Sequence, residues 1–170
     1  MIFSNMLLPY IQIARIDHWF KNVFMLPGVV LVLFDDPSLM GPDLLWKLLI
    51  AFIATGFVAS SNYVINEILD APQDALHPVK KNRPVPSGQV NVTVGYFEWL
   101  LLAAIGLGLA WGMGKPFFCS ALALWVMGCI YNIPPLRSKD KPYLDVLSLS
   151  LIHISEPTRP TRASRMPSSA

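Results

Sequence analysis

Long segments without a charged residue alternate with short polar segments along this chain. The uncharged segments are residues 22–34, 48–66, 99–114 and 116–136. A helix needs about 20 apolar residues to cross the hydrocarbon layer of a membrane. Segments 48–66 and 116–136 are long enough, and 99–114 becomes long enough when it is extended back over 90–97. The pattern therefore predicts transmembrane helices.

The first uncharged segment is the shortest. Pro27 and Gly28 interrupt it, and both residue types weaken a helix interior. We therefore expect its helix to begin further back, near Arg15, with the polar residues facing protein or lipid headgroups. Together the segments predict four crossings of the membrane.

The composition agrees with a membrane protein. Of the 170 residues, 54% are hydrophobic and only 14% are charged, and the mean hydropathy is +0.48. These values are too apolar for an ordinary soluble domain of this length. We therefore expect an all-α, polytopic integral membrane protein.

Basic residues fall in alternate polar segments. Segments 35–43 and 112–115 hold three aspartates and a single lysine, whereas the polar segments between them are basic. Because cytoplasmic loops carry the excess of Lys and Arg in membrane proteins, we expect the N-terminus, the 66–92 loop and the 132–143 loop to be cytoplasmic. The basic residues concerned are Arg15, Lys21, Lys80, Lys81, Arg83, Arg137, Lys139 and Lys141.

A row of polar residues ends the second apolar segment. Asn62, Asn66, Asp70 and Asp74 are four residues apart, which places neighbours about 5–6 Å apart on one side of a helix. Pro72 has no N–H, so we expect the helix to stop or bend there and Asp74 to lie on the following loop. Carboxylates at a membrane edge are costly unless cations neutralise them. Mg²⁺ prefers oxygen ligands and is commonly shared between carboxylates and substrate phosphates, so the row predicts a site for Mg²⁺ and a diphosphate.

The loop after this row is basic and rich in proline. Lys80, Lys81 and Arg83 would supply the positive side of a phosphate site, Arg as a planar fork and Lys as a point charge. Alternatively, these residues are only the positive charges of a cytoplasmic loop. That alternative does not account for the acidic row beside them.

The acidic row and the basic loop together resemble a known motif. NEILDAPQD (66–74) followed by HPVKKNRPVPSG (77–88) resembles the first aspartate-rich motif of the UbiA superfamily of intramembrane prenyltransferases, Asn-Asp-x-x-Asp-x-x-x-Asp before a basic Arg-Pro loop. This chain departs at Glu67, which keeps the carboxylate on a longer arm. The resemblance implies catalytic Mg²⁺–diphosphate binding by Asn66, Asp70 and Asp74, a further metal ligand in Glu67, and phosphate contacts from Lys80, Lys81 and Arg83.

Two further segments are similar to the same family. ARIDHWFKN (14–22) resembles the start of its first helix, and YNIPPLRSKDKPYLDVLS (131–148) resembles the approach to its second acidic motif. Taken alone, these segments are typical of an interfacial tryptophan with neighbouring bases and of a proline turn with a charged rim. By resemblance, Arg15, Lys21, Asn22, Tyr131, Arg137 and Lys139 would contact the substrate diphosphate, and Asp145 would be a metal ligand of the second motif.

The resemblance implies both a fold and a reaction. The family fold is a bundle of about nine transmembrane helices, of which this chain would supply the first four to five. The reaction would be Mg²⁺-dependent transfer of a prenyl group from an isoprenyl diphosphate donor to a lipid-soluble or aromatic acceptor within the membrane. Membrane lipid would be a partner, and nothing in the charge pattern implies nucleic acid.

Two alternatives remain open at this stage. Trp-x-Lys-Asn (19–22) and His-Pro-x-Lys (77–80) also resemble transferases that join phosphoribosyl diphosphate to a polyprenyl phosphate. A different class of protein, a cation transporter, would use Asn66, Asp70 and Asp74 to line a pathway. A transporter would place these residues near the middle of the membrane, whereas here they follow the apolar segment and precede a basic loop.

The character of the sequence changes after residue 148. Residues 149–170 are rich in Ser, Thr, Pro and Arg, and LSLIHISEPTR within them resembles the translation of a sequencing-library adapter. Three arginines and one glutamate in this stretch account for the net charge of +2. We therefore expect residues 1–148 to be the N-terminal part of a transferase domain, inactive by itself, and residues 149–170 to be a non-native, disordered tail.

Overall fold

The computed structural model describes residues 2–135, 137 and 139, and the side chains from residue 7 onward. Every regular element in this part of the chain is a helix, which confirms the prediction of an all-α fold. In chain order the elements are α1 (Ile2–Ala14), the 3-10 helix η1 (Ile16–Met25), α2 (Leu26–Asp35), η2 (Pro37–Leu39), α3 (Leu44–Asp74), η3 (Lys80–Asn82), α4 (Val92–Gly112) and α5 (Lys115–Asn132).

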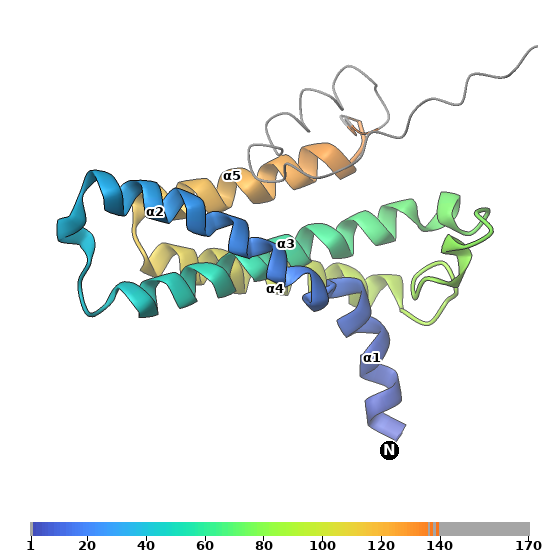
Figure 1. The fold of residues 1–170 in the computed structure, drawn as a ribbon. Coiled ribbons are helices and arrows are strands. Elements are labelled where there is room, and N and C mark those ends of the chain that lie inside the picture. The colour runs from blue at the N-terminus through green and yellow to red at the C-terminus, as the bar shows by residue number, and fades with distance from the viewer. Residues whose placement is uncertain (1, 136, 138, 140–170) are drawn as a thin grey trace, which may run out of the picture.

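The long helix α3 organises the bundle. It contacts α1, η1, α4 and α5, and α4 also contacts α5. In Figure 1 the α3–α4 loop and the last turn of α5 lie at one end of the bundle, and the α2–α3 and α4–α5 connections lie at the other. Helix α1 extends away from the bundle at an angle. This arrangement brings residues about 70 positions apart in sequence to the same end.

Three helical segments of the described residues are long and apolar enough to cross a membrane: Leu7–Asp35, Leu44–Asp74 and Val92–Gly112. The first of them contains a break at Arg15, where the sequence predicted the helix to begin. The fourth predicted crossing coincides with α5, which has 18 residues. Helix α5 is not among the three segments above because Lys115 and Asn132, its first and last residues, lower its mean hydropathy. The chain is therefore an integral membrane helical bundle.

Small residues allow α3 and α4 to approach closely. A Cβ atom added to Gly106 would lie 2.8 Å from Val58 Cγ2 and 2.9 Å from the Ala54 carbonyl oxygen. Ala103 and Ala110, one turn to either side of Gly106 on α4, are also buried. Helices in lipid associate through such van der Waals contact, because lipid chains are as apolar as the side chains they replace. This interface fixes the position of α4 along α3.

Trp19 attaches η1 to the middle of α3. Its indole lies against Gly56, where a Cβ atom would be only 2.6 Å from the ring, and its Nε1 donates to Ser60 Oγ at 2.8 Å. The ring also meets Phe57 edge-on, with centroids 5.2 Å apart. Gly56 is therefore small for a packing reason, and Trp19 holds the N-terminal segment beside the polar half of α3.

A serine links three helices on the other side of α3. Ser61 Oγ donates to the Trp99 carbonyl oxygen at 3.0 Å and accepts from Trp125 Nε1 at 3.2 Å. The two indoles stack, with centroids 5.8 Å apart. Because α4 carries Trp99 and α5 carries Trp125, this contact fixes both helices relative to the middle of α3.

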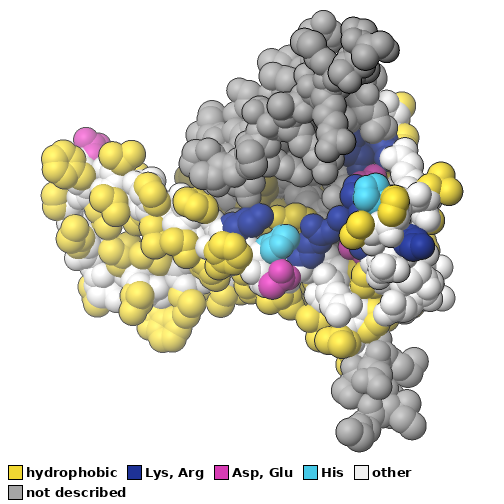
Figure 2. Space-filling model, turned by 45° about the vertical axis from the view of Figure 1, so that its right-hand side comes forward, with side chains coloured by type: hydrophobic (Ala, Val, Ile, Leu, Met, Phe, Trp, Pro, Cys, Tyr) yellow, Lys and Arg dark blue, Asp and Glu magenta, His cyan; other side chains and the backbone are white. Residues whose placement is uncertain are grey.

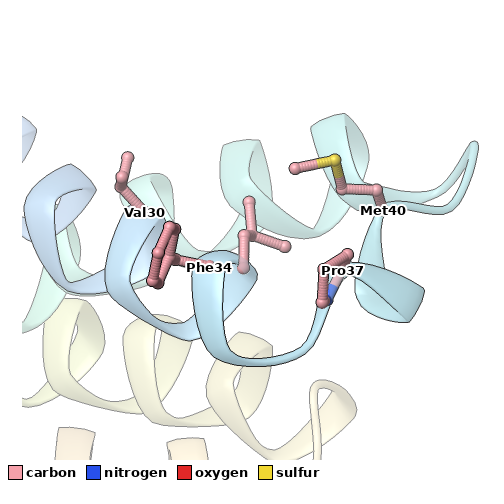
Figure 3. Close-up of a pocket in the computed structure, with 5 residues that line it drawn as sticks. Val30, Phe34, Pro37 and Met40 are labelled. Atoms are coloured by element: carbon pink, nitrogen blue, oxygen red, sulfur yellow. The ribbon is translucent and has the colours of Figure 1, made fainter.

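The end of the molecule around α2 and η2 is apolar. Figure 3 shows side chains of Val30, Phe34, Pro37 and Met40 around a pocket that Leu33 also lines. Phe34 is 88% exposed, and the large apolar side chains of α2 face outward, as expected of surfaces that meet lipid. The pocket offers no polar side chain, so the chemistry of the chain has to be sought at the opposite end.

Candidate functional site

Charged side chains gather at the end of the bundle formed by the α3–α4 loop and the end of α5. Figure 2 shows most Lys, Arg, Asp, Glu and His side chains of that face close together, beside an area that is almost wholly hydrophobic. Helix α3 brings its polar row to this end. The described residues thus contain one strongly polar region attached to an apolar bundle.

Helix α3 continues through Pro72 to Asp74, which corrects the prediction that Asp74 lies on the loop after a helix that stops at the proline. A proline removes one N–H and the hydrogen bond it would make. Pro72 lies in the last turn of the helix, where little else is lost, and Ala75 N still donates to the Ala71 carbonyl oxygen at 2.9 Å. Asp74 is therefore the last residue of the helix and is 3% exposed.

The first part of the site, here called the Asp70 group, joins α3 to the end of α5. Lys139 Nζ lies 2.5 Å from Asp70 Oδ1, 3.0 Å from Asn66 Oδ1 and 3.2 Å from Asn132 Oδ1. Arg137 Nη2 donates to Asp70 Oδ1 at 3.0 Å. Asn66 and Asp70 are therefore brought together with Arg137 and Lys139, as the sequence predicted.

The second part, the Asp74 group, lies where α3 meets the basic loop. Arg83 Nη1 is 2.6 Å from Asp74 Oδ2, and Lys80 Nζ is 3.3 Å from Asp74 Oδ1. Each carboxylate oxygen thus faces its own cation. Lys81 is exposed and shares no ion pair with a described residue. Lys80 and Arg83 are therefore held beside the acidic row, and Lys81 is not.

The third part, the Glu67 group, faces the N-terminal segment. Glu67 is 3% exposed; its Oε2 lies 3.8 Å from Arg15 Nη2, and its Oε1 accepts from Val85 N at 3.4 Å. Arg15 also lies over the Tyr63 ring, with Cζ 5.5 Å from the centroid. Arg15 adopts φ 49° and ψ 48°, left-handed values that a non-glycine residue adopts only under local constraint. Glu67 therefore ties the N-terminal segment to the basic loop.

The remaining predicted residues lie on η1, at the end of α5 and beyond it. Lys21 is half-buried on η1, and Asn22 Nδ2 is buried without a hydrogen-bond partner among the described residues. Tyr131 is half-buried in the last turn of α5. Asp145 lies outside the described residues.

One member of the Asp70 group, Asn132, was missed in the sequence reasoning. It is the last residue of α5 and is 3% exposed. The signal that could have revealed it is an amide at the end of an apolar helix, one residue after Tyr131, which the reasoning did select. Its partner Lys139 lies seven residues along the chain, but the Asn66 and Asp70 oxygens that share this lysine come from α3, so spacing alone could not connect Asn132 with them.

The donor atoms of the Asp70 group suit a hard cation. In the part of the chain that the structure describes, no three His, Cys, Asp or Glu side chains come together, and Glu67, Asp70 and Asp74 lie in separate groups. In the Asp70 group, however, two amide oxygens and one carboxylate oxygen surround the Lys139 ammonium group, and Arg137 shares the carboxylate oxygen. Oxygen donors of this kind are the ligands that Mg²⁺ prefers. The residues present therefore fit Mg²⁺.

Fold and site together define a multi-pass membrane protein with a charged centre at one end of a helical bundle. The chain belongs to the UbiA prenyltransferase family, whose model matches residues 23–154. This family membership confirms the resemblance drawn from the acidic row and the basic loop.

Several curated proteins are similar to this chain. Nodulation protein NoeC of Azorhizobium caulinodans is 30% identical over 122 residues, which are 72% of this chain and 38% of that protein. Decaprenyl-phosphate phosphoribosyltransferase of Mycobacterium tuberculosis is 28% identical over 108 residues, 64% of this chain and 36% of that protein. Chloroplastic 2-acylphloroglucinol 4-prenyltransferase of Humulus lupulus is 30% identical over 125 residues, 71% of this chain and 29% of that protein. The chain thus spans well under half the length of these relatives.

Proposed function

We propose that residues 1–148 form the diphosphate-binding part of a Mg²⁺-dependent transferase that moves a prenyl group from an isoprenyl diphosphate to a lipid-soluble or aromatic acceptor. The observation that carries this proposal is the pairing of Asp70 and Asp74 with four cations at one end of an apolar bundle: Lys80, Arg83, Arg137 and Lys139. A diphosphate needs such cations, and an isoprenyl chain needs the adjoining apolar helices.

The chain's own residues would act chiefly on the leaving group. Asn66 and Asp70 would hold Mg²⁺, which when bound neutralises negative charge on the diphosphate. Arg83 and Arg137 present planar forks of N–H donors that match phosphate oxygens. As the bond between the donor carbon and the diphosphate oxygen breaks, its electron pair stays on that oxygen, and these donors stabilise the charge that develops there.

The ion pairs prepare the cations for this role. Asp74 orients Lys80 and Arg83 before any donor is bound, and Asp70 does the same for Arg137. A cation that is already oriented loses less conformational freedom on binding. The apolar surfaces beside the site exclude water, which would otherwise compete with the acceptor.

Transfer of a phosphoribosyl group is a second candidate. Its support is the similarity to decaprenyl-phosphate phosphoribosyltransferases, including that of Mycobacterium tuberculosis. In such a reaction the diphosphate would leave a sugar, and a polyprenyl phosphate would be the acceptor. The same cations would serve both reactions, so the donor has to be identified by experiment.

A binding measurement tests the proposal on this chain itself. The chain would be placed in lipid nanodiscs and titrated with labelled geranylgeranyl diphosphate in the presence of Mg²⁺. We expect saturable binding that inorganic diphosphate displaces, and about tenfold weaker binding in Asp70→Asn, because a charged contact contributes about 1.5–3 kcal/mol. Asp43→Asn, an exposed aspartate at the opposite end of α3, is the matched control and should bind as the wild type does.

The outcomes separate the candidates. Saturable binding of geranylgeranyl diphosphate supports prenyl transfer, whereas binding of labelled phosphoribosyl diphosphate alone supports the second candidate. The proposal fails if geranylgeraniol, which lacks phosphate, binds as tightly as its diphosphate. It also fails if Asp70→Asn leaves the affinity unchanged.

A further inference from the structure

Asn132 holds its side chain in one orientation inside the Asp70 group. Its Nδ2 donates to the Gly128 carbonyl oxygen one turn earlier on α5, at 2.9 Å. That bond leaves Oδ1 free to face Lys139 Nζ at 3.2 Å. The residue is 3% exposed, so the position of Oδ1 is set by the protein and not by solvent.

Lys139 has no N–H left over in this arrangement. An ammonium group has three donors and no acceptor. Three oxygens lie within hydrogen-bonding distance of Lys139 Nζ, one each from Asn66, Asp70 and Asn132. Lys139 therefore cannot contact a phosphate while it stays there, although the proposed function gives it that role.

A divalent cation resolves this conflict. It carries twice the charge of an ammonium group and prefers the same oxygen atoms. If it takes those oxygens, Lys139 is released next to the newly bound cation, and mutual repulsion drives its ammonium group toward the negative diphosphate. The surroundings of Asp74 differ from those of Asp70. Among the described residues, the polar contacts of the Asp74 side chain are Lys80 and Arg83, and they include no second oxygen ligand for a cation.

We infer that Asn132 is a further ligand of the divalent-cation site on Asn66 and Asp70, and that Lys139 occupies this site until the cation enters. The inference rests on the proposed function for the role of Lys139 toward diphosphate. It adds an α5 residue to a site that the sequence motif places wholly on α3. It also couples entry of the cation to release of the phosphate-binding lysine.

Binding of Mn²⁺, followed by the loss of its free electron paramagnetic resonance signal, tests the inference. Mn²⁺ takes oxygen ligands as Mg²⁺ does. The chain in nanodiscs would be titrated as wild type, Asn132→Leu and Lys139→Met. We expect Mn²⁺ to bind about tenfold more weakly to Asn132→Leu, which keeps the volume and loses the oxygen. We expect at least about threefold tighter binding to Lys139→Met, which loses the competing charge.

Two further variants control the measurement. Asn82→Leu makes the same chemical change in the exposed loop and should bind Mn²⁺ as the wild type does. Asn132→Asp keeps an oxygen at the site, and its affinity should equal or exceed that of the wild type. Recovery of affinity by Asp at position 132 separates loss of a ligand from misfolding of Asn132→Leu.

Failure of this inference differs from failure of the proposed function. Unchanged Mn²⁺ affinity in Asn132→Leu, or weaker binding in Lys139→Met, overturns the inference even where geranylgeranyl diphosphate still binds the wild type. Conversely, the proposed function fails if the wild-type chain binds Mn²⁺ as expected across these variants but binds no diphosphate compound. In that case the role of Asn132 in the cation site stands.

Discussion

At the residue scale, neighbouring carboxylates of α3 have different partners. Glu67 and Asp70 are three residues apart, yet Glu67 pairs with Arg15 and Val85 N, and Asp70 pairs with Arg137 and Lys139. At about 100° per residue, a separation of three leaves the two side chains about 60° apart around the helix axis, enough to bring each beside a different segment. The site is thus divided between the N-terminal segment and the end of α5.

The division predicts a structural role for Glu67. Glu67→Gln removes the charge beside Arg15, and we expect it to lower the free energy of unfolding by about 1–3 kcal/mol, since it leaves one partner of a buried pair uncompensated. Unfolding of the chain in mixed micelles by increasing denaturing detergent would measure this. Asp17→Asn is the control, because Asp17 is 76% exposed where it faces His18 and should contribute under about 0.5 kcal/mol. Equal effects from the two changes would contradict the role assigned to Glu67.

Sequence reasoning reached part of this residue-level arrangement. It selected Asn66, Asp70 and Lys139, which do meet. By resemblance it made Glu67 a further metal ligand beside that row, whereas a difference of one position from Asn66 turns the Glu67 side chain toward another neighbour. Whether Glu67 also reaches a metal ion stays a prediction.

At the scale of elements, the close approach of α3 and α4 around Ala54 and Val58 depends on a glycine. Gly106 faces Ala54 and Val58, whereas Gly108, two positions along the same helix, has no atom within 4 Å of an added Cβ. Substituting each glycine in turn therefore compares a position on α4 that contacts α3 with a position on the same helix that does not. The difference comes from the helical period alone, which turns Gly108 away from α3.

We expect the same substitution to be destabilising at Gly106 and nearly neutral at Gly108. Gly106→Val should lower the free energy of unfolding by about 1–3 kcal/mol, because the added atoms force the helices apart. Gly108→Val adds the same β-branched side chain toward lipid and should change it by under about 0.5 kcal/mol. Both would be measured by the same detergent-induced unfolding. A loss in Gly108→Val as large as that in Gly106→Val would contradict the packing role assigned to Gly106, since helix propensity by itself favours valine over glycine.

At the scale of the whole molecule, basic side chains gather at one end. The basic loop and the end of α5 form that end, whereas α2 and η2 expose mostly apolar side chains together with Asp35 and Asp36 (Figure 2). An excess of Lys and Arg favours the cytoplasmic side of a membrane. The same charges that we propose for diphosphate binding would therefore also orient the chain.

Orientation gives a prediction about labelling. In a background with Cys119→Ala and Cys129→Ala, we expect Lys81→Cys to react with an impermeant maleimide only from the cytoplasmic side, and Met40→Cys only from the other. Both positions are exposed, at opposite ends of α3. Right-side-out and inverted vesicles would supply the two conditions. Reaction of both cysteines from the same side would contradict a membrane-spanning α3.

Apolar length and helical spacing are local properties of the chain, so the helices and the residues of the polar row could be predicted from the sequence alone. A local error, the helix end expected at Pro72, arose because a proline in the last turn costs only one hydrogen bond. Which cations face which carboxylates, and that Asn132 shares Lys139 with Asp70, follows from the tertiary structure. Those contacts depend on how α5 and η1 pack against α3, and that packing rests on the contacts of Ser61, Trp19 and Gly56 with their neighbours.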